Sequence, residues 1–513
     1  MASPDYIVIG GGTSGLVVAN RLSENPDVHV LVLETGRDLS ADPRVNVPAL
    51  FTALLGSDAA WQYQSVPQPG LGGRKSYTLI PPSDQATLDH LGIDWIDSEE
   101  HGTSGPIKVS FPGIIQNPLC KAWIDAFRSL NKVTNADPFS GNSVGGYSNM
   151  STVHPETKTR SYAGLAYGAP LRQRPNLRIL TEAKTEKFLF SETGTGIFKA
   201  IGGRLETFTP KREVILAAGA FNTPKLLELS GIGNKTLLED LGVVDGIVTG
   251  DPLMRQEPEA LAQAQNFYTE HKAGPFAIGG IQSHSFMPTP DAVGLLDQLP
   301  GPERPEDSEQ YEIVRSILDD PVGSSAAWFM FLAQANLHEG GKSFVGMKLL
   351  PGNFASLGCI HSHPLSRGTT HISSADVDAM PNIDSRYFLH PADLEVMVRH
   401  VQALDTKLRS TTSLSSFLKP DGQRNHPDAF HISDLEGAKK YVLDTATAAY
   451  HSCGTAAMLP KDKGGVVDSK LVVYGTENLR VVDASIFPLI PRGNILSSVY
   501  AVAEKAADII KGH

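Results

Sequence analysis

The apolar residues near the N-terminus are grouped into a strand, a helix and a second strand. Tyr6–Ile9 form an unbroken apolar run, which is typical of a short strand buried on both faces. A helical segment is expected over Leu16–Leu22, and a second apolar run, Val28–Leu33, predicts another strand. Strand, helix and strand in this order indicate a βαβ unit with a parallel sheet.

Similar patterns predict elements along the rest of the chain. Apolar runs predict further strands of the same sheet at Leu177–Leu180 and Val214–Ala217, and helical spacing predicts a C-terminal helix over Val499–Ile510. The candidate strands of a second, antiparallel sheet are Ile107–Phe111, Ser343–Leu350 and Thr369–Ile372. The acidic, proline-bounded segment Pro302–Asp320 predicts a solvated helix flanked by loops.

The composition is that of a globular protein without a nucleic-acid-binding face. The chain has 513 residues, of which 41% are hydrophobic and 19% are charged, so it can bury a large core divided between two or more domains. The formal net charge of −12 argues against general binding to nucleic acids, which requires a basic surface. The three widely spaced cysteines predict neither a disulfide framework nor a cysteine zinc site.

No targeting or membrane segment is evident in the sequence. No run of about 18 apolar residues predicts a membrane span, and the N-terminus lacks the charged and apolar regions of a signal peptide. We therefore expect a cytoplasmic protein that does not associate with a membrane.

A glycine-rich turn joins the first strand to the first helix. Gly10, Gly12 and Gly15 match the G-x-G-x-x-G pattern of dinucleotide-binding units, and the second strand ends in Glu34, 19 positions after Gly15. In such units the first glycine permits the tight turn, the second lets the backbone approach a pyrophosphate, and the third lets helix and strand pack closely. The sequence therefore predicts a dinucleotide site.

The start of the helix and the end of the second strand supply the binding groups. The free N–H groups at the helix start, near Thr13 and Ser14, would face the negative charge of the phosphates. Glu34 would accept hydrogen bonds from the ribose hydroxyls. These residues do not distinguish a nicotinamide dinucleotide from a flavin dinucleotide.

The C-terminal part of the chain favours a flavin. The segment Leu479–Ser485 is expected to form a strand that ends in an acid, Asp483. In many flavoproteins such an element returns to the first domain and places the acid beside the ribityl chain. The alternative is that Asp483 is an ordinary turn residue at the end of a strand, although the flavin interpretation is preferred.

Several segments together resemble one protein family. The N-terminal unit continues as Glu34-Thr35-Gly36, and Gly219–Gly233 forms a long and specific motif. Near the C-terminus stand His451–Thr455 and Pro491–Asn494. These segments are similar to the N-terminal unit, the second signature and the two catalytic segments of the glucose-methanol-choline (GMC) oxidoreductases, and of fungal members in particular. The resemblance covers most of the chain.

Two blocks expected from this resemblance are missing. The first family signature should follow Lys75, but the chain continues with Ser76–Pro82. A second block should follow Val243, where the chain reads Val244–Gly250 instead. The first block normally lines the flavin ring and pyrophosphate and carries the usual region of covalent linkage. The sequence is thus identified as a family member that lacks the first signature.

The resemblance implies an α/β fold with two domains and FAD as the cofactor. A Rossmann-like FAD-binding domain would comprise residues 1–82, 176–250 and 464–513. An α+β substrate-binding domain with an antiparallel sheet would comprise residues 83–175 and 251–463. The FAD-binding residues expected from the motifs and the resemblance are Gly10, Gly12, Thr13, Ser14, Gly15, Glu34, Ala218, Asp483 and Ala484.

His451 and Asn494 are the candidate catalytic residues. By the resemblance, His451 lies on the reactive face of the flavin, where a neutral imidazole can take the hydroxyl proton of an alcohol as hydride leaves the same carbon. Asn494 stands where family members carry a second His or Asn, and its amide would orient the substrate oxygen. Because asparagine cannot act as a base, that role is assigned to His451. The nearby Cys453 is interpreted as a packing residue.

Three other patterns are interpreted as structural. Gly141–Gly145 matches the G-x-S-x-G nucleophile elbow, but a loop precedes it where the elbow needs a strand. His361, His363 and His371 have possible metal-ligand spacing without a convincing fourth ligand, so no metal site is predicted. The aromatic run at 328–331 could line a substrate pocket, although core packing is preferred.

The sequence leaves three functions open. The first is the FAD-dependent oxidation of a small-molecule alcohol by hydride transfer, with aromatic or secondary-metabolite alcohols suggested by analogy alone. The second is a non-redox lyase or cyclase of the same fold, and the third is an inactive, truncated family member. The sequence separates neither oxidase from dehydrogenase nor covalent from non-covalent flavin, and it does not indicate the oligomeric state.

Overall fold

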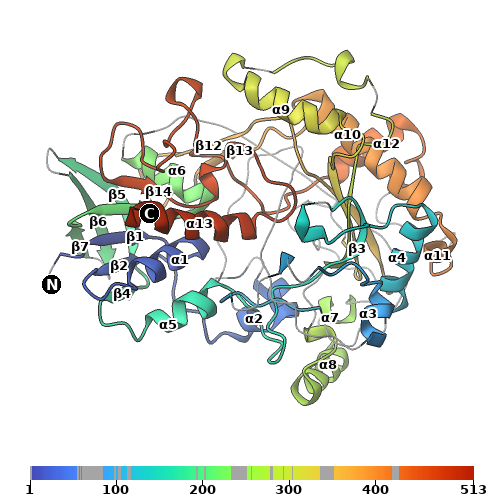
Figure 1. Cartoon of the computed structure of the whole chain (residues 1–513), viewed down its shortest axis with the longest axis horizontal. Coiled ribbons are helices and arrows are strands. Elements are labelled where there is room, and N and C mark those ends of the chain that lie inside the picture. The colour runs from blue at the N-terminus through green and yellow to red at the C-terminus, as the bar shows by residue number, and fades with distance from the viewer. Residues whose placement is uncertain are drawn as a thin grey trace.

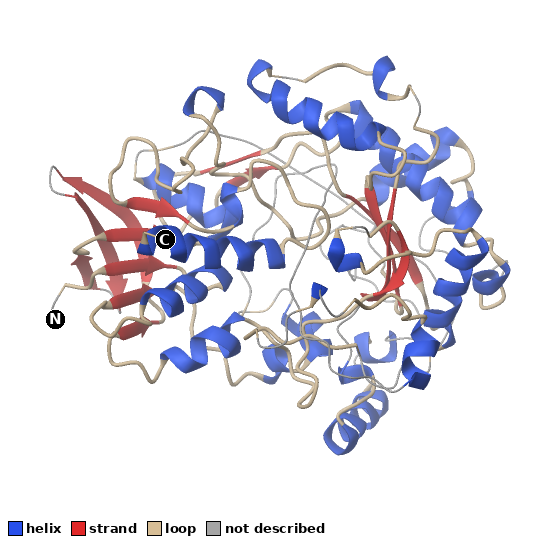
Figure 2. Ribbon diagram, in the orientation of Figure 1, coloured by secondary structure: helices blue, strands red, loops and turns tan. Residues whose placement is uncertain are grey.

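The fold is known from a computed structural model, which describes most of the chain. The described residues are 3–54, 57, 59, 85–97, 100–101, 105–111, 117–141, 143–191, 194–201, 204–230, 232, 251–255, 257–277, 281–292, 294–302, 304–335, 352–418 and 427–512. Two groups of strands lie at opposite ends of the molecule, with helices around and between them (Figures 1 and 2). Both termini lie beside the same group of strands (Figure 1).

A five-stranded parallel sheet unites distant parts of the chain. Its strands are β1 (Tyr6–Ile9), β2 (Val30–Leu33), β4 (Leu177–Leu180), β8 (Glu213–Leu216) and β14 (Leu479–Val481). They are arranged in the order β14-β8-β1-β2-β4, and every neighbouring pair is parallel. The Rossmann-like part of the predicted fold is therefore confirmed, with small shifts at the strand ends.

Helices α1 (Thr13–Leu22) and α13 (Leu496–Lys511) pack against each other beside this sheet (Figure 1). Their apolar faces share one core with the parallel strands. Arg21 on α1 forms two hydrogen bonds with the carboxylate of Glu504 on α13, at 2.6 and 2.9 Å. The two ends of the chain are thus joined by both packing and an ion pair.

A second, smaller group of elements adjoins the parallel sheet. Strands β5 (Lys184–Ser191), β6 (Gly194–Ile201) and β7 (Arg204–Phe208) form a three-stranded antiparallel sheet. Helix α6 (Gly219–Leu229) follows β8 and packs against β5. Shorter helices in this half are α2 (Pro43–Asn46) and α5 (Ala169–Leu171).

The other end of the molecule contains the predicted antiparallel sheet. Its strands are β11 (Ser356–His361), β10 (Ala326–Phe331), β9 (Ile281–Met287) and β3 (Gly145–Ser148), in that order. Each neighbouring pair is antiparallel. The aromatic run at 328–331 belongs to β10, whose residues are all buried, in agreement with core packing.

The strands proposed from the sequence for this sheet are not the ones that form it. Ile107–Phe111 contributes only an isolated bridge between Ser110 and Ser151. The segment predicted at 369–372 is β12 (Thr369–His371), which pairs with β13 (Asn382–Asp384) in a separate two-stranded sheet. The predicted strand 343–350 lies outside the described residues.

Helices surround the antiparallel sheet. They are α3 (Gln85–Leu91), α4 (Pro118–Ser129), α7 (Asp251–Met254), α8 (Pro258–His271), α9 (Ser308–Asp319), α10 (Pro391–Ala403), α11 (Thr412–Ser415) and α12 (Leu435–Thr445). Within the described ranges, none of the helices has the length and hydropathy needed to cross a membrane.

Helix α9 differs from the solvated helix that its acidic sequence predicts. Tyr311, Val314 and Leu318 recur at helical spacing and are buried in a small core with Leu365 and Ala392. The acidic residues occupy the remaining faces of an amphipathic helix. The prediction considered the charges of this segment and therefore missed the apolar face that packs into the core.

Candidate cofactor and active site

The carboxyl ends of all five parallel strands meet at one edge of the sheet, where the residues that follow them line a cavity. These residues are Gly10 after β1, Glu34 after β2, Thr181 after β4, Ala217 after β8 and Asp483 after β14. The cavity has a volume of about 880 Å³. In open α/β sheets, ligands bind at this edge.

The turn after β1 brings the backbone close to this cavity. Gly10 has a φ of +106°, and a Cβ at this position would lie 2.2 Å from the carbonyl oxygen of Ala217. A Cβ on Gly15 would lie 1.8 Å from the carbonyl oxygen of Gly10, because α1 packs directly against the turn. Gly12, in contrast, has no neighbouring atom of the described residues within 4 Å of its Cβ position. The open space at Gly12 is where a ligand can approach.

The N-terminus of α1 offers unsatisfied donors to this space. The N-cap residue is Gly12, so no side chain caps the helix. Ser14 is only 4% exposed, and its Oγ has no hydrogen-bond partner in the part of the chain that the structure describes. Unpaired backbone N–H groups and buried hydroxyls are unfavourable, and a phosphate group can accept hydrogen bonds from both. The residues present therefore fit the pyrophosphate of a dinucleotide.

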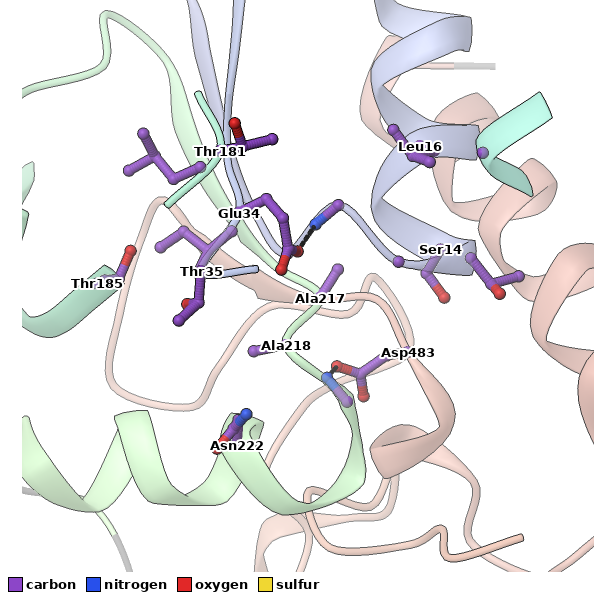
Figure 3. A pocket seen from close by; sticks show the side chains of 18 of the residues that line it. Ser14, Leu16, Glu34, Thr35, Thr181, Thr185, Ala217, Ala218, Asn222 and Asp483 are labelled. Carbon is purple, nitrogen blue, oxygen red and sulfur yellow. Dashed lines mark hydrogen bonds between the residues drawn. The ribbon is translucent and has the colours of Figure 1, made fainter. Parts of the chain in front are cut away.

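Glu34 is held in place beside the same turn. Its Oε2 accepts a hydrogen bond from Gly11 N at 2.6 Å (Figure 3), and its Oε1 accepts one from Gly36 N, also at 2.6 Å. A carboxylate has about four acceptor positions. Glu34 can therefore keep these two bonds and still accept hydrogen bonds from ribose hydroxyls.

Asp483 connects the end of β14 to the N-terminus of α6. Its Oδ2 accepts hydrogen bonds from Gly219 N at 2.9 Å and from Thr223 Oγ1 at 2.6 Å (Figure 3). Its Oδ1 accepts one from Ser485 N at 2.9 Å. The side chain is buried, and a negative charge is favourable at a helix N-terminus. Asp483 thereby fixes this part of the cavity wall.

The structure brings together nearly all of the predicted cofactor-binding residues. Those that line the cavity are Gly10, Gly12, Thr13, Ser14, Glu34, Ala218, Asp483 and Ala484. Gly15 is the exception, because it lies at the contact between α1 and the turn. The predicted set thus comes from both ends and the middle of the chain.

His451 and Asn494 are adjacent although 43 positions separate them in the sequence. Asn494 Nδ2 lies 2.6 Å from His451 Nε2. An amide nitrogen can only donate, so the contact is a hydrogen bond to Nε2 in the tautomer that carries its proton on Nδ1. His451 is partly buried and Asn494 is exposed, and neither belongs to the residues that line the cofactor cavity.

The segment that carries His451 is attached to the cavity wall. Thr455 Oγ1 donates a 2.7 Å hydrogen bond to the carbonyl oxygen of Ala220, in the first turn of α6. Gly454 N donates to the carbonyl oxygen of Ala484 at 3.1 Å. These bonds hold the catalytic candidate near the residues around Asp483.

Cys453 behaves as the packing residue that the sequence predicts. It packs against the core around the parallel sheet. Burial raises the pKa of its thiol to about 12, so the reactive thiolate does not form near neutral pH.

The other sequence patterns have structural explanations. A single 3₁₀ turn at Pro138–Ser140 precedes the G-x-S-x-G match, and β3 begins at Gly145, so the strand and helix of a nucleophile elbow are missing at this place. His361 Nε2 lies 3.1 Å from Asp393 Oδ1. His371 Nδ1 is hydrogen-bonded to Glu228. Each of these two histidines has a carboxylate partner inside the fold.

Sequence reasoning missed several residues of the cavity wall. They are Thr181, Lys184, Thr185, Asn222 and Lys225. Asn222 and Lys225 stand within the long motif at 219–233, which was a signal that could have identified them. Lys184 and Thr185 belong to no motif and become neighbours of the cavity only through the folding of β5.

Family models match two long parts of the chain. Residues 4–248 and 364–503 match the model described as GMC oxidoreductase, in an N-terminal and a C-terminal part. Together these parts exceed half of the 513 residues. The chain belongs to the GMC oxidoreductase family. Members of this family are FAD-dependent oxidoreductases, and FAD is accordingly the cofactor of this chain.

Relatives of this chain include fungal dehydrogenases, and the alignments with them cover nearly all of both sequences. The chain is 29% identical to dehydrogenase mpl7 of Monascus purpureus, over 99% of this chain and 96% of the relative. It is 30% identical to a dehydrogenase of Armillaria gallica, over 99% of this chain and 93% of the relative.

Solved structures with similar folds include oxidoreductases. An FAD-dependent oxidoreductase from Chaetomium thermophilum has a TM-score of 0.81 at 23% identity, and the match covers 99% of both chains. A fungal aryl-alcohol oxidase has a TM-score of 0.76 at 23% identity, again over 99% of both chains. At this identity the likeness shows the fold alone.

This GMC chain is internally shorter than its relatives. The alignment with mpl7 extends over 607 positions, whereas this chain has 513 residues, so at least 94 of those positions are gaps in it. The shortening agrees with the absence of family segments after Lys75 and Val243. Both of these places lie outside the described residues.

Proposed function

We propose that this GMC oxidoreductase oxidises a small alcohol, with His451 as the base and Asn494 as the group that orients the substrate oxygen. The observation that carries the proposal is the 2.6 Å contact between Asn494 Nδ2 and His451 Nε2. It places a possible base and an amide donor side by side, so a substrate oxygen that displaces the amide from Nε2 can contact both groups. An alcohol oxygen bound there needs both groups.

His451 Nε2 removes the hydroxyl proton of the bound alcohol. A base needs a free lone pair, and the tautomer with its proton on Nδ1 has one on Nε2, the atom beside the Asn494 amide. Loss of this proton increases the negative charge on the alcohol oxygen and weakens the bond from the neighbouring carbon to its hydrogen. The chemistry that FAD supplies is acceptance of the hydride from that carbon.

Asn494 Nδ2 donates a hydrogen bond to the substrate oxygen when the alcohol replaces it on His451. The bond fixes the direction of the hydroxyl group and stabilises the charge that develops on its oxygen. An asparagine amide is not a base near neutral pH. His451 is therefore the residue that takes the proton, and Asn494 is the residue that orients the substrate.

The substrate is proposed to bind between the two halves of the molecule. In this arrangement the FAD-binding domain comprises residues 1–82, 176–250 and 464–513, and the substrate-binding domain comprises residues 83–175 and 251–463. The strands of the parallel sheet fall in the first set and those of the four-stranded antiparallel sheet fall in the second, which supports this division.

An aromatic or secondary-metabolite alcohol is the proposed substrate class. The support is analogy with the fungal dehydrogenases and with a structural neighbour described as an aryl-alcohol oxidase. Another structural neighbour is a formate oxidase. Formate is therefore tested beside an alcohol as a small substrate of a different class.

The test is anaerobic reduction of the FAD-loaded protein. We expect benzyl alcohol to bleach the visible flavin absorption band and formate to leave it unchanged. Dithionite provides the control, because it reduces any redox-competent flavin. A flavin that dithionite bleaches but no alcohol reduces would contradict alcohol oxidation and favour the lyase or cyclase alternative. A protein that does not take up FAD would indicate an inactive family member.

A further inference from the structure

Two buried hydroxyl groups on the cavity wall have no hydrogen-bond partner among the residues that the structure describes. They are Ser14 Oγ, on a side chain that is 4% exposed, and Thr185 Oγ1, on a side chain that is 5% exposed. A buried hydroxyl without a partner is unfavourable, because it loses its hydrogen bonds to water and gains none. Such groups at a binding site are expected to find their partner in the ligand. Ser14 is explained by the pyrophosphate, whereas Thr185 is not.

Thr185 lies at the opposite side of Glu34 from Ser14. In Figure 3, Ser14 is on the side of α1, Glu34 and Thr35 are in the middle, and Thr185 is on the far side. A dinucleotide with its pyrophosphate at α1 and its ribose at Glu34 extends its base in the direction away from the helix. That direction leads toward Thr185.

The backbone at Thr185 is irregular in a way that orients its side chain. Thr185 is paired with Lys199 on β6, and the next pair joins Lys187 to Phe198. Glu186 is therefore an extra residue, and β5 contains a bulge immediately after Thr185. Bulges bend a strand and redirect side chains, and they are frequent beside binding sites.

The charged groups of the same wall already have partners. Lys225 Nζ donates a 2.8 Å hydrogen bond to the carbonyl oxygen of Val377. Lys184 forms an ion pair with Asp378. Thr185 Oγ1 is thus the buried polar group of this wall that still needs a partner among the described residues.

We propose that Thr185 Oγ1 hydrogen-bonds the adenine base of FAD and increases the preference of this protein for FAD over flavin mononucleotide. Adenine presents both acceptor nitrogens and an amino donor at its edges, and a hydroxyl can pair with either. Flavin mononucleotide has no adenine, so it cannot use this group. Thr185 is accordingly a cofactor-selecting residue outside the glycine-rich motif.

The test compares the binding of two flavins to Thr185→Val. Valine has nearly the shape of threonine but lacks the hydroxyl. We expect its Kd for FAD, measured by quenching of flavin fluorescence on the apoprotein, to rise roughly tenfold, which is the effect of losing about one hydrogen bond. The Kd for flavin mononucleotide should stay within twofold of wild type. Thr185→Ser, which keeps the hydroxyl, should restore most of the affinity for FAD.

The stability of the apoprotein provides an independent readout. Removal of an unpaired buried hydroxyl should leave the Tm of the apoprotein unchanged or raise it, while the increase in Tm caused by FAD becomes smaller. Thr370→Val is the matched control, because Thr370 is also 5% exposed with an unpaired Oγ1 but does not line the cavity. It should affect the apoprotein in the same way and leave the Kd for FAD unchanged.

Three results would overturn the proposal. The first is a Kd for FAD in Thr185→Val within twofold of wild type. The second is an equal loss of affinity for both flavins, which would indicate a general change of the cavity. The third is a lower Tm of the Thr185→Val apoprotein, which would mean that the hydroxyl already has a partner within the fold.

Discussion

At the scale of single residues, the candidate active site depends on one contact between neutral polar groups. His451 is partly buried and carries its lone pair on the atom that faces Asn494. Neither residue lines the cofactor cavity. Their replacement should therefore change the chemistry without preventing cofactor binding.

Replacement of the histidine tests its role as a base. We expect His451→Gln to lower the rate of anaerobic flavin reduction by an alcohol roughly 10² to 10⁴-fold, because general base catalysis contributes about that much. The Kd for FAD and the flavin spectrum should remain those of the wild type. Stopped-flow absorbance measures the rate, and full activity in the variant would show that another group takes the proton.

Replacement of the asparagine separates orientation from proton transfer. Asn494→Ala should reduce the same rate by roughly 10- to 10³-fold, because one donor to the substrate oxygen is lost. His451→Gln should also remove the dependence of the rate on the protonation of a base, whereas Asn494→Ala should keep it. A pH profile of flavin reduction distinguishes the two outcomes. Loss of the pH dependence in Asn494→Ala would contradict the division of roles.

At the scale of secondary-structure elements, the turn between β1 and α1 has two glycines with different physical tasks. The Cβ position of Gly15 is 1.8 Å from a backbone oxygen, whereas that of Gly12 has no atom of the described ranges within 4 Å. One glycine is required by the fold and the other by the ligand. The same sequence motif therefore serves packing and binding at separate positions.

The pair Gly12→Ala and Gly15→Ala tests this distinction. Gly15→Ala should destabilise the protein by several kcal/mol or prevent folding, because α1 must move away from β1. Gly12→Ala should leave the Tm of the apoprotein close to that of the wild type and weaken FAD binding at least tenfold. Differential scanning calorimetry and fluorescence titration measure the two effects. A strongly destabilised Gly12→Ala variant would show that this position, too, is required for packing.

At the scale of the whole molecule, buried histidines make the fold sensitive to acid. Burial lowers the pKa of His400 to about 3, and its ring accepts a 3.0 Å hydrogen bond from Trp328 Nε1. Burial also lowers the pKa of His363 to about 4. Below a pH of about 6.5 the unfolded chain binds protons at these rings and the folded chain does not. Stability is therefore complete above that pH and declines as the pH falls toward the lower values.

Urea denaturation between pH 7 and pH 4.5 tests this expectation. His400 alone should lower the free energy of unfolding by about 1.4 kcal/mol for each pH unit below about 6. His400→Gln retains hydrogen-bonding groups but cannot be protonated, so its stability should depend less steeply on pH, by the equivalent of one proton. An unchanged slope in this variant would mean that His400 does not contribute to the acid sensitivity.

Sequence patterns predicted the secondary structure correctly where it depends on residues that are close together in the chain. The strand Tyr6–Ile9 agrees with the sequence because its unbroken apolar run is typical of a parallel strand that is buried on both faces. For the second sheet, the sequence predicted correctly that it is antiparallel, but it did not predict which strands form it. β3 contains Gly145 and Gly146, and a Cβ on Gly146 would lie 2.4 Å from the ring of Phe127. This strand lacks the apolar run that would predict it, because glycines are needed where α4 packs closely against it.

The sequence by itself determined the family, the glycine-rich turn and the acid that follows the second strand, because the motifs for each consist of residues that are close together in the chain. Only the tertiary structure decided which distant residues share the cavity. Asp483 meets Gly219, and His451 meets Asn494, because β14 and the C-terminal segments return to the first sheet. Thr185 gives no signal in the sequence, since its hydroxyl becomes notable only when burial removes water and leaves it without a partner.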